Sequence, residues 1–121
     1  MAVILIVEDD VFIREIAVMT IEDWGHKTLS ASDVDEALVL LRSSKSIDLL
    51  FTDIYLQMAV HGGCELAHQA VKLRPELRVL YTTGNFVTDT MKAQLIDGTH
   101  FLRKPYTPHQ LQMSVDDLLA A

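Results

Sequence analysis

The chain has 121 residues, half of them hydrophobic, and a formal net charge of −7. This length suffices for one domain with a substantial core, and we expect residues 1–121 to form a single domain. The acidic balance and the scattered basic residues argue against nucleic-acid binding, which needs clustered lysines and arginines. No apolar run approaches the ~20 residues of a membrane span, and no signal peptide is recognisable. Because Cys64 is the only cysteine, we expect a cytoplasmic location without membrane association.

The first apolar run, residues 2–7, reads AVILIV and predicts a strand of a parallel sheet that is buried on both faces. A helix is predicted over residues 11–23, with Gly25 just beyond it as a stop signal. The apolar side chains of this segment recur at helical spacing: Phe12, Ile13, Ile16, Ala17, Met19 and Trp24.

Residues 26–31 predict a weaker second strand, and residues 47–53 predict a third strand that ends in an acid. Between these two strands, Ser32 and Asp35 have the spacing of a capping box. They therefore predict a helix that runs to about Leu41.

The second half of the chain continues the alternation. A helix is predicted over residues 64–73, a fourth strand over residues 78–83, and a helix over residues 87–95. Residues 100–104 predict a short fifth strand, and residues 107–110 (TPHQ) carry the signals that start a last helix. Five strands alternating with five helices imply right-handed βαβ units, and therefore a parallel sheet that is covered on both sides.

Polar and charged side chains follow four of the predicted strands. They are Glu8, Asp9 and Asp10 after the first strand, Asp53 after the third, Thr82 and Thr83 after the fourth, and Lys104 after the fifth. Ligands of such folds bind at the carboxyl ends of the strands, so we expect these side chains to converge. Clustered carboxylates suit a hard cation such as Mg²⁺, whereas a lysine and a hydroxyl suit the oxygens of a negatively charged group. We interpret Asp10 as the acid that starts the first helix.

In their order and spacing, four motifs resemble a response regulator receiver domain of two-component signalling. They are the acids after the first strand, Asp53 after the third, the Thr83-Gly84 step, and KPY at residues 104–106. The resemblance covers essentially the whole chain, and it implies a doubly wound sheet with the flavodoxin-like strand order 2-1-3-4-5. The segments YTTGN and FLRKPY are most similar to receivers that stand alone or end hybrid histidine kinases.

The resemblance implies a role for each acid of the site. Asp53 matches the phosphoryl acceptor, which attacks a phosphohistidine on a histidine kinase or histidine phosphotransferase. Glu8 and Asp9 match the acidic pair that, together with Asp53, holds Mg²⁺. The backbone carbonyl of Tyr55 is expected to be a further metal ligand.

The remaining motifs imply a switch. Thr83 and Lys104 match the residues that contact the phosphoryl oxygens, and Lys104-Pro105 is expected to be a cis bond. Phe101 occupies the position of the aromatic switch residue and is expected in the core. Phosphorylation would then change the face formed by the fourth helix, the fifth strand and the fifth helix, which a downstream protein reads. The implied protein is a switch that assists its own phosphorylation and dephosphorylation, not an enzyme, and both monomer and dimer remain open.

The sequence departs from the family pattern beside the acceptor. Gln57 stands where the family usually has proline, and the segment that leads to the next glycine looks about two residues longer. Gly84 replaces a common alanine or serine, which leaves room over the site. Tyr55 is bulky at a position that covers the pocket.

Other functions fit less well. The main alternative is a Mg²⁺-dependent phosphatase or phosphotransferase that forms an aspartyl phosphate on a related fold. Such enzymes commonly have a second aspartate where this chain has Tyr55. A flavodoxin-type flavin module is disfavoured because the acids of EDDVF would repel a phosphate, and a receiver-like scaffold without phosphorylation is the last alternative.

Overall fold

The computed structural model describes residues 2–56, 62–84, 92, 93, 95, 96 and 100–120. Its strands are β1 (Val3–Val7), β2 (Lys27–Ala31), β3 (Leu49–Asp53), β4 (Arg78–Thr83) and β5 (His100–Arg103). Its helices in this part of the chain are α1 (Val11–Asp23), α2 (Val34–Leu41), α3 (Gly62–Leu73) and α5 (Pro108–Ala120). The helix predicted over residues 87–95 falls largely outside the described residues.

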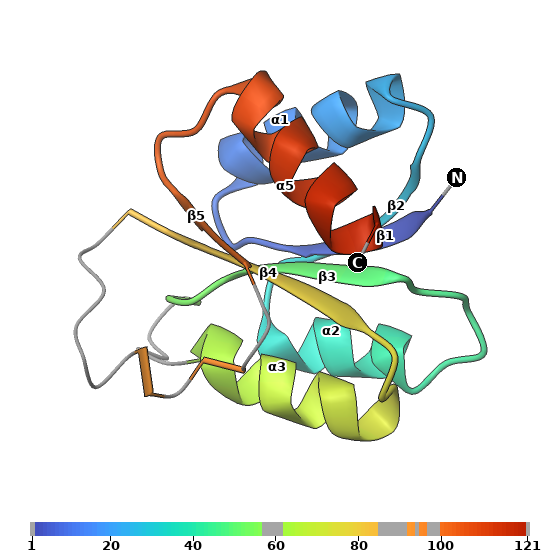
Figure 1. Cartoon of the computed structure of the whole chain (residues 1–121). Coiled ribbons are helices and arrows are strands. Elements are labelled where there is room, and N and C mark those ends of the chain that lie inside the picture. The colour runs from blue at the N-terminus through green and yellow to red at the C-terminus, as the bar shows by residue number, and fades with distance from the viewer. Residues whose placement is uncertain (1, 57–61, 85–91, 94, 97–99, 121) are drawn as a thin grey trace.

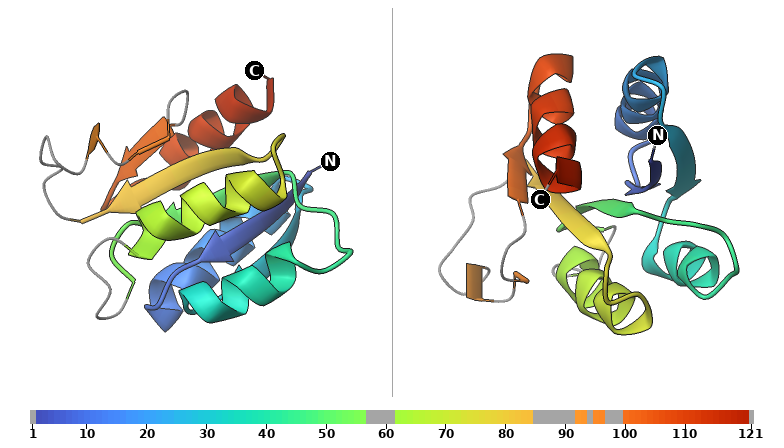
Figure 2. Two further views of the ribbon diagram at one scale, coloured as in Figure 1. Left: turned by 90° about the horizontal axis from the view of Figure 1, so that it is seen from below. Right: turned by 45° about the vertical axis from the view of Figure 1, so that its right-hand side comes forward.

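The strands form one parallel sheet in the order β2-β1-β3-β4-β5, which confirms the predicted fold class. Helices α1 and α5 lie on one face of this sheet, and α2 and α3 lie on the other (Figure 1). Two further views show the same three layers (Figure 2). Among the described residues, no helix has both the length and the apolar character that a membrane crossing needs.

Each face of the sheet has its own apolar core, because neighbouring residues of a strand point to opposite faces. On β1, for example, Ile4 and Ile6 pack under α1 and α5, whereas Leu5 and Val7 pack over α2 and α3. All four side chains are buried. This explains the unbroken apolar run of the first strand.

The ends of α1 agree with the prediction. The side chain of Asp10 caps the helix by accepting a hydrogen bond from the backbone of Ile13 at 3.1 Å. The chain leaves the helix through Trp24 and through Gly25, whose φ of 90° favours glycine.

The predicted capping box of α2 was wrong by one residue. The capping residue is Asp33, which accepts a hydrogen bond from the backbone of Glu36 at 2.8 Å. Ser32 instead donates its hydroxyl to the Glu36 carboxylate. Two overlapping motifs were available here, and the helix begins at the aspartate whose third following residue is a glutamate.

The predicted start of α5 is confirmed. The backbone of Thr107 donates to the side chain of Gln110 at 2.9 Å, and the backbone of Gln110 donates to the Thr107 hydroxyl at 3.1 Å. These reciprocal bonds satisfy two groups that a helix start leaves unpaired. The buried side of α5 is formed by Leu111, Val115 and Leu118.

The expectation that Phe101 lies in the core was wrong. Phe101 is 37 % exposed, because it lies on the edge strand β5, where only Leu102 is buried. On α1, the buried residues are Ala17 and Ile21, whereas several apolar residues of the predicted helical pattern are more than half exposed. These exposed residues are Phe12, Ile16 and Met19.

Candidate functional site

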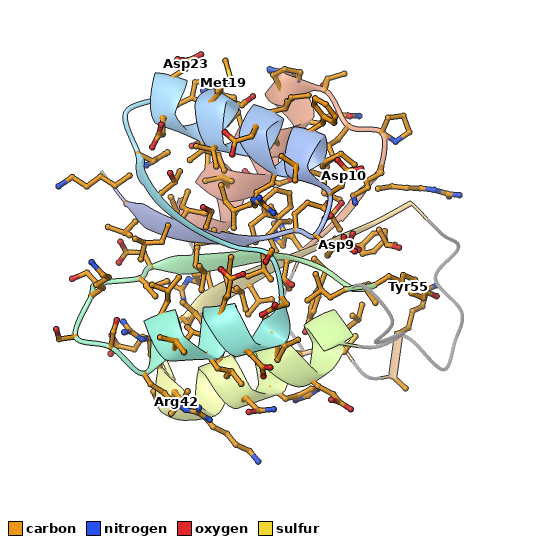
Figure 3. All side chains as sticks on the ribbon, turned by 180° about the vertical axis from the view of Figure 1, so that it is seen from behind. Asp9, Asp10, Met19, Asp23, Arg42 and Tyr55 are labelled. Carbon is orange, nitrogen blue, oxygen red and sulfur yellow. The ribbon has the colours of Figure 1, made fainter. Side chains whose placement is uncertain are left out.

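The carboxyl ends of β1, β3, β4 and β5 lie along one edge of the sheet. The register pairs Asp53 with Thr82 and Thr83 with Arg103. The backbone of Lys104 donates to the Thr83 carbonyl at 3.0 Å, which extends this pairing by one residue. Asp9 and Tyr55 lie at this edge in Figure 3, away from Arg42 at the end of α2.

Three of the predicted acids come together at this edge. Glu8, Asp9 and Asp53 each offer a carboxylate oxygen, and these oxygens lie within 4.8 Å of one another. Glu8 is 4 % exposed and Asp53 is 5 % exposed. Buried carboxylates at this spacing repel one another, so the site requires positive charge.

Lys104 supplies positive charge from the end of β5. Its ammonium lies 2.5 Å from Oε1 of Glu8 and 2.7 Å from Oδ2 of Asp53. The other oxygen of Asp53, Oδ1, accepts a hydrogen bond from the backbone of Tyr55 at 3.0 Å. The Asp53 carboxylate is therefore oriented by a cation on one side and by a backbone amide on the other.

One ammonium shared by two carboxylates leaves an excess negative charge in a buried site. Burial raises the pKa of Glu8 to about 7, although the hydrogen bond from Lys104 acts in the opposite direction. For Lys104, burial alone would lower the pKa, but its hydrogen bonds to Asp53 and Glu8 raise it overall. Lys104 therefore stays charged. When no metal is bound, protonation of Glu8 reduces the repulsion between the clustered carboxylates.

The structure also places the remaining predicted residues. Thr83 is fully buried at the end of β4. Tyr55 packs against the core on the α2 and α3 side of the sheet. Phe101 lies on β5, three residues before Lys104, and is partly exposed. The Lys104-Pro105 bond is cis, as expected.

The departures from the family pattern are partly described. Gln57 lies outside the described residues. Gly63, at the start of α3, packs directly on the backbone of Asp53: a Cβ at this position would lie 2.0 Å from the Asp53 carbonyl oxygen. At Gly84, the described atoms nearest to a Cβ belong to the Lys104 side chain, the first at 3.9 Å. Among the described residues, there is therefore room beside Lys104 for the one methyl group that an alanine would add.

Two residues to which the sequence assigned no role also lie at the site. A guanidinium nitrogen of Arg14, on α1, donates to the Glu8 carbonyl at 2.8 Å. Tyr106 lines a small cavity together with Glu8 and Phe51, and its ring packs edge-on against Phe51. The signal for Arg14 was its place in the first turn of a helix, where the helix dipole disfavours a cation.

Comparisons with known proteins agree with this arrangement. Residues 4–116 match the family described as "Response regulator receiver domain". The chain is 31 % identical to the nitrogen assimilation regulatory protein NtrX of Azorhizobium caulinodans, over 89 % of this chain and 24 % of NtrX. It is 27 % identical to the response regulator SaeR of Staphylococcus aureus, over 96 % of this chain and 50 % of SaeR. The chain thus spans about a quarter of the length of NtrX and half of the length of SaeR.

Solved structures show the same similarity. The receiver domain of NtrX from Brucella abortus superposes with a TM-score of 0.86 at 31 % identity, and the match covers 98 % of both chains. A response regulator receiver protein from Sinorhizobium medicae superposes with a TM-score of 0.91 at 26 % identity, covering 99 % of this chain and 95 % of the other. Sequence, strand order and structural neighbours agree, and the chain belongs to the response regulator receiver domain family of two-component signalling.

Proposed function

We propose that residues 1–121 form a receiver domain in which Asp53 accepts a phosphoryl group from a phosphohistidine of a histidine kinase or phosphotransferase. The observation that carries this proposal is the convergence of three carboxylates within 4.8 Å, with the Lys104 ammonium on two of them. In the reaction, an oxygen of Asp53 forms a bond to phosphorus, the phosphorus–nitrogen bond breaks, and the imidazole leaves as the neutral base after taking up a proton.

The donor set fits a divalent cation. Glu8, Asp9 and Asp53 supply the carboxylate oxygens that Mg²⁺ prefers, and we assign the backbone carbonyl of Tyr55 as a further ligand. When bound, Mg²⁺ would offset the repulsion between the acceptor carboxylate and an anionic phosphoryl group.

The residues around the acceptor have distinct roles in this proposal. The backbone amide of Tyr55 holds one oxygen of Asp53 in place. Lys104 already contacts the other oxygen of Asp53. After phosphorylation, its ammonium would contact the negatively charged phosphoryl oxygens. Thr83, buried at the end of the adjacent strand, would donate its hydroxyl to the same group. We propose that its shift, together with Phe101, alters the surface formed by β5 and α5 for a downstream protein or for onward phosphotransfer.

The test uses acetyl phosphate as a small phosphodonor and measures the intact mass of the protein. We expect one added phosphoryl group in the presence of Mg²⁺, and none in EDTA or in the Asp53→Asn variant. Asp10→Asn is the matched control, because asparagine also caps a helix and Asp10 is not one of the three clustered acids. An unchanged mass of the folded wild-type protein in Mg²⁺ would overturn the proposal.

A further inference from the structure

Arg14 occupies an unfavourable position unless it has a local partner. It is half-buried in the first turn of α1, where its backbone amide makes the first helical hydrogen bond, to Asp10 at 2.9 Å. The positive end of the helix dipole disfavours a cation there, typically by several tenths of a kcal/mol. The partner is the backbone carbonyl of Glu8, 2.8 Å from the guanidinium.

This contact is one of the hydrogen bonds that hold Glu8 in the turn between β1 and α1. The amide of Glu8 donates to the Ala31 carbonyl of β2 at 3.1 Å, and the Glu8 carbonyl accepts from Arg14. The amide of Asp10 donates to the Glu8 carboxylate at 3.2 Å. Both backbone groups of Glu8 are thus tied to neighbouring elements, and Asp9 lies between two residues that are held in place.

We propose that Arg14 is a positioning residue for the acidic pair: its guanidinium fixes the carbonyl of Glu8, and the turn then presents the Glu8 and Asp9 carboxylates to a divalent cation. This inference rests on the proposed function, because it assumes that the pair binds Mg²⁺. Residues that orient metal ligands commonly change metal affinity by 10- to 100-fold when they are mutated.

A positioning role and a simple charge effect predict opposite results. If Arg14 acted only as a positive charge near the acids, its removal would strengthen Mg²⁺ binding, because two cations repel each other. If Arg14 holds the turn, its removal weakens Mg²⁺ binding despite the lost repulsion. The sign of the change in affinity therefore separates the two roles.

The experiment follows backbone amide resonances by NMR as MgCl₂ is added to the metal-free protein. It compares the wild type with Arg14→Met, which removes the guanidinium but keeps a long side chain, and with Arg14→Lys, which keeps the charge. Arg42→Met is the matched control, because Arg42 is exposed at the end of α2 and lies away from Asp9 (Figure 3).

We expect the Mg²⁺ dissociation constant to rise roughly tenfold in Arg14→Met, to rise less in Arg14→Lys, and to be unchanged in Arg42→Met. Already in EDTA, the amide resonances of Asp9 and Asp10 should shift in Arg14→Met but not in Arg42→Met. A wild type that binds Mg²⁺ together with an Arg14→Met variant that binds equally well or more tightly would overturn the positioning role alone. A wild type without Mg²⁺-dependent shifts at Glu8, Asp9 or Asp53 would overturn the proposed function as well.

Discussion

The turn after β1 and the last residue of β3 both place carboxylates in the site, but different contacts hold them. In the β1 turn, the fixing contacts include side chains: Arg14 binds the Glu8 carbonyl, and Asp10 caps α1. At the end of β3, most of these contacts are made by the backbone, and one side chain, the Thr52 hydroxyl, donates to the Asp53 carbonyl at 3.0 Å. Ile54 donates to the Thr82 carbonyl at 2.9 Å, and Gly63 donates to the Ile54 carbonyl at 3.0 Å.

Because of this difference, we expect substitutions in the two regions to have different effects. A side-chain hydrogen bond can be lost while the turn relaxes, so substitutions in the β1 turn should have graded effects. The backbone of Asp53 lies in close contact with Gly63, and a packed interior does not deform to admit another atom. Substitution at Gly63 should therefore change both the stability of the protein and the position of Asp53.

The largest effect is expected for Gly63→Ala. The new Cβ would lie 2.0 Å from the carbonyl oxygen of Asp53, so α3 or the end of β3 has to move. We expect a loss of about 3 kcal/mol in the free energy of unfolding, measured by urea denaturation. Gly84→Ala is the control, because its Cβ would make only ordinary contact with Lys104. Equal stability of the two alanine variants would contradict this account of β3.

Lys104→Met removes the cation that both strands share. It removes the one cation that pairs with Glu8 and Asp53 in the described part of the chain, and both acids are buried. The free energy of unfolding in EDTA at pH 8 should therefore fall. We expect about 2 kcal/mol, less than for a fully buried pair because the Lys104 side chain is 17 % exposed. Saturating Mg²⁺ should recover much of this loss.

The comparison for Lys104→Met is Lys45→Met, which removes an exposed lysine outside the site. Lys45→Met should change stability little, both in EDTA and in Mg²⁺. If the two variants lost equal stability, Lys104 would not be compensating the buried acids.

A further effect is expected from pH. The folded protein raises the pKa of Glu8 from 4.5 to about 7, so between these pH values it keeps a proton that the unfolded chain has released. The free energy of unfolding of the metal-free protein should therefore decrease as pH rises through this window. Glu8→Gln should lose this part of the slope. Parallel pH profiles for wild type and Glu8→Gln, measured by urea denaturation in EDTA, would contradict the assignment.

Much of the fold was predictable because local patterns and topology rules agree. The strand order was implied by the family resemblance, and the acids at the strand ends were predicted to converge because parallel strands bring their carboxyl ends together. The three clustered acids and their contact with Lys104 follow directly from that rule. The start of α5 was also predictable, because Thr107 and Gln110 have the spacing at which their side chains and backbones form reciprocal hydrogen bonds.

The errors arose where sequence patterns do not specify surroundings. Phe101 is apolar, but an edge strand leaves it partly exposed. Phe12 and Ile16 follow the helical period of α1, yet α1 buries a neighbouring stripe instead. A cation in the first turn of a helix indicates that Arg14 needs a local partner, but residue types do not show that this partner is the Glu8 carbonyl. They do not show the close approach of Gly63 to Asp53 either.

The most direct test of the account is to locate the phosphoryl group by residue. The protein is treated with acetyl phosphate and Mg²⁺, the acyl phosphate is reduced with borohydride, and the modified residue is identified by peptide mass spectrometry. We expect modification at Asp53 alone, because Lys104 and the Tyr55 amide orient this carboxylate from both sides. Modification at Glu8 or Asp9, or none in the folded protein, would contradict it.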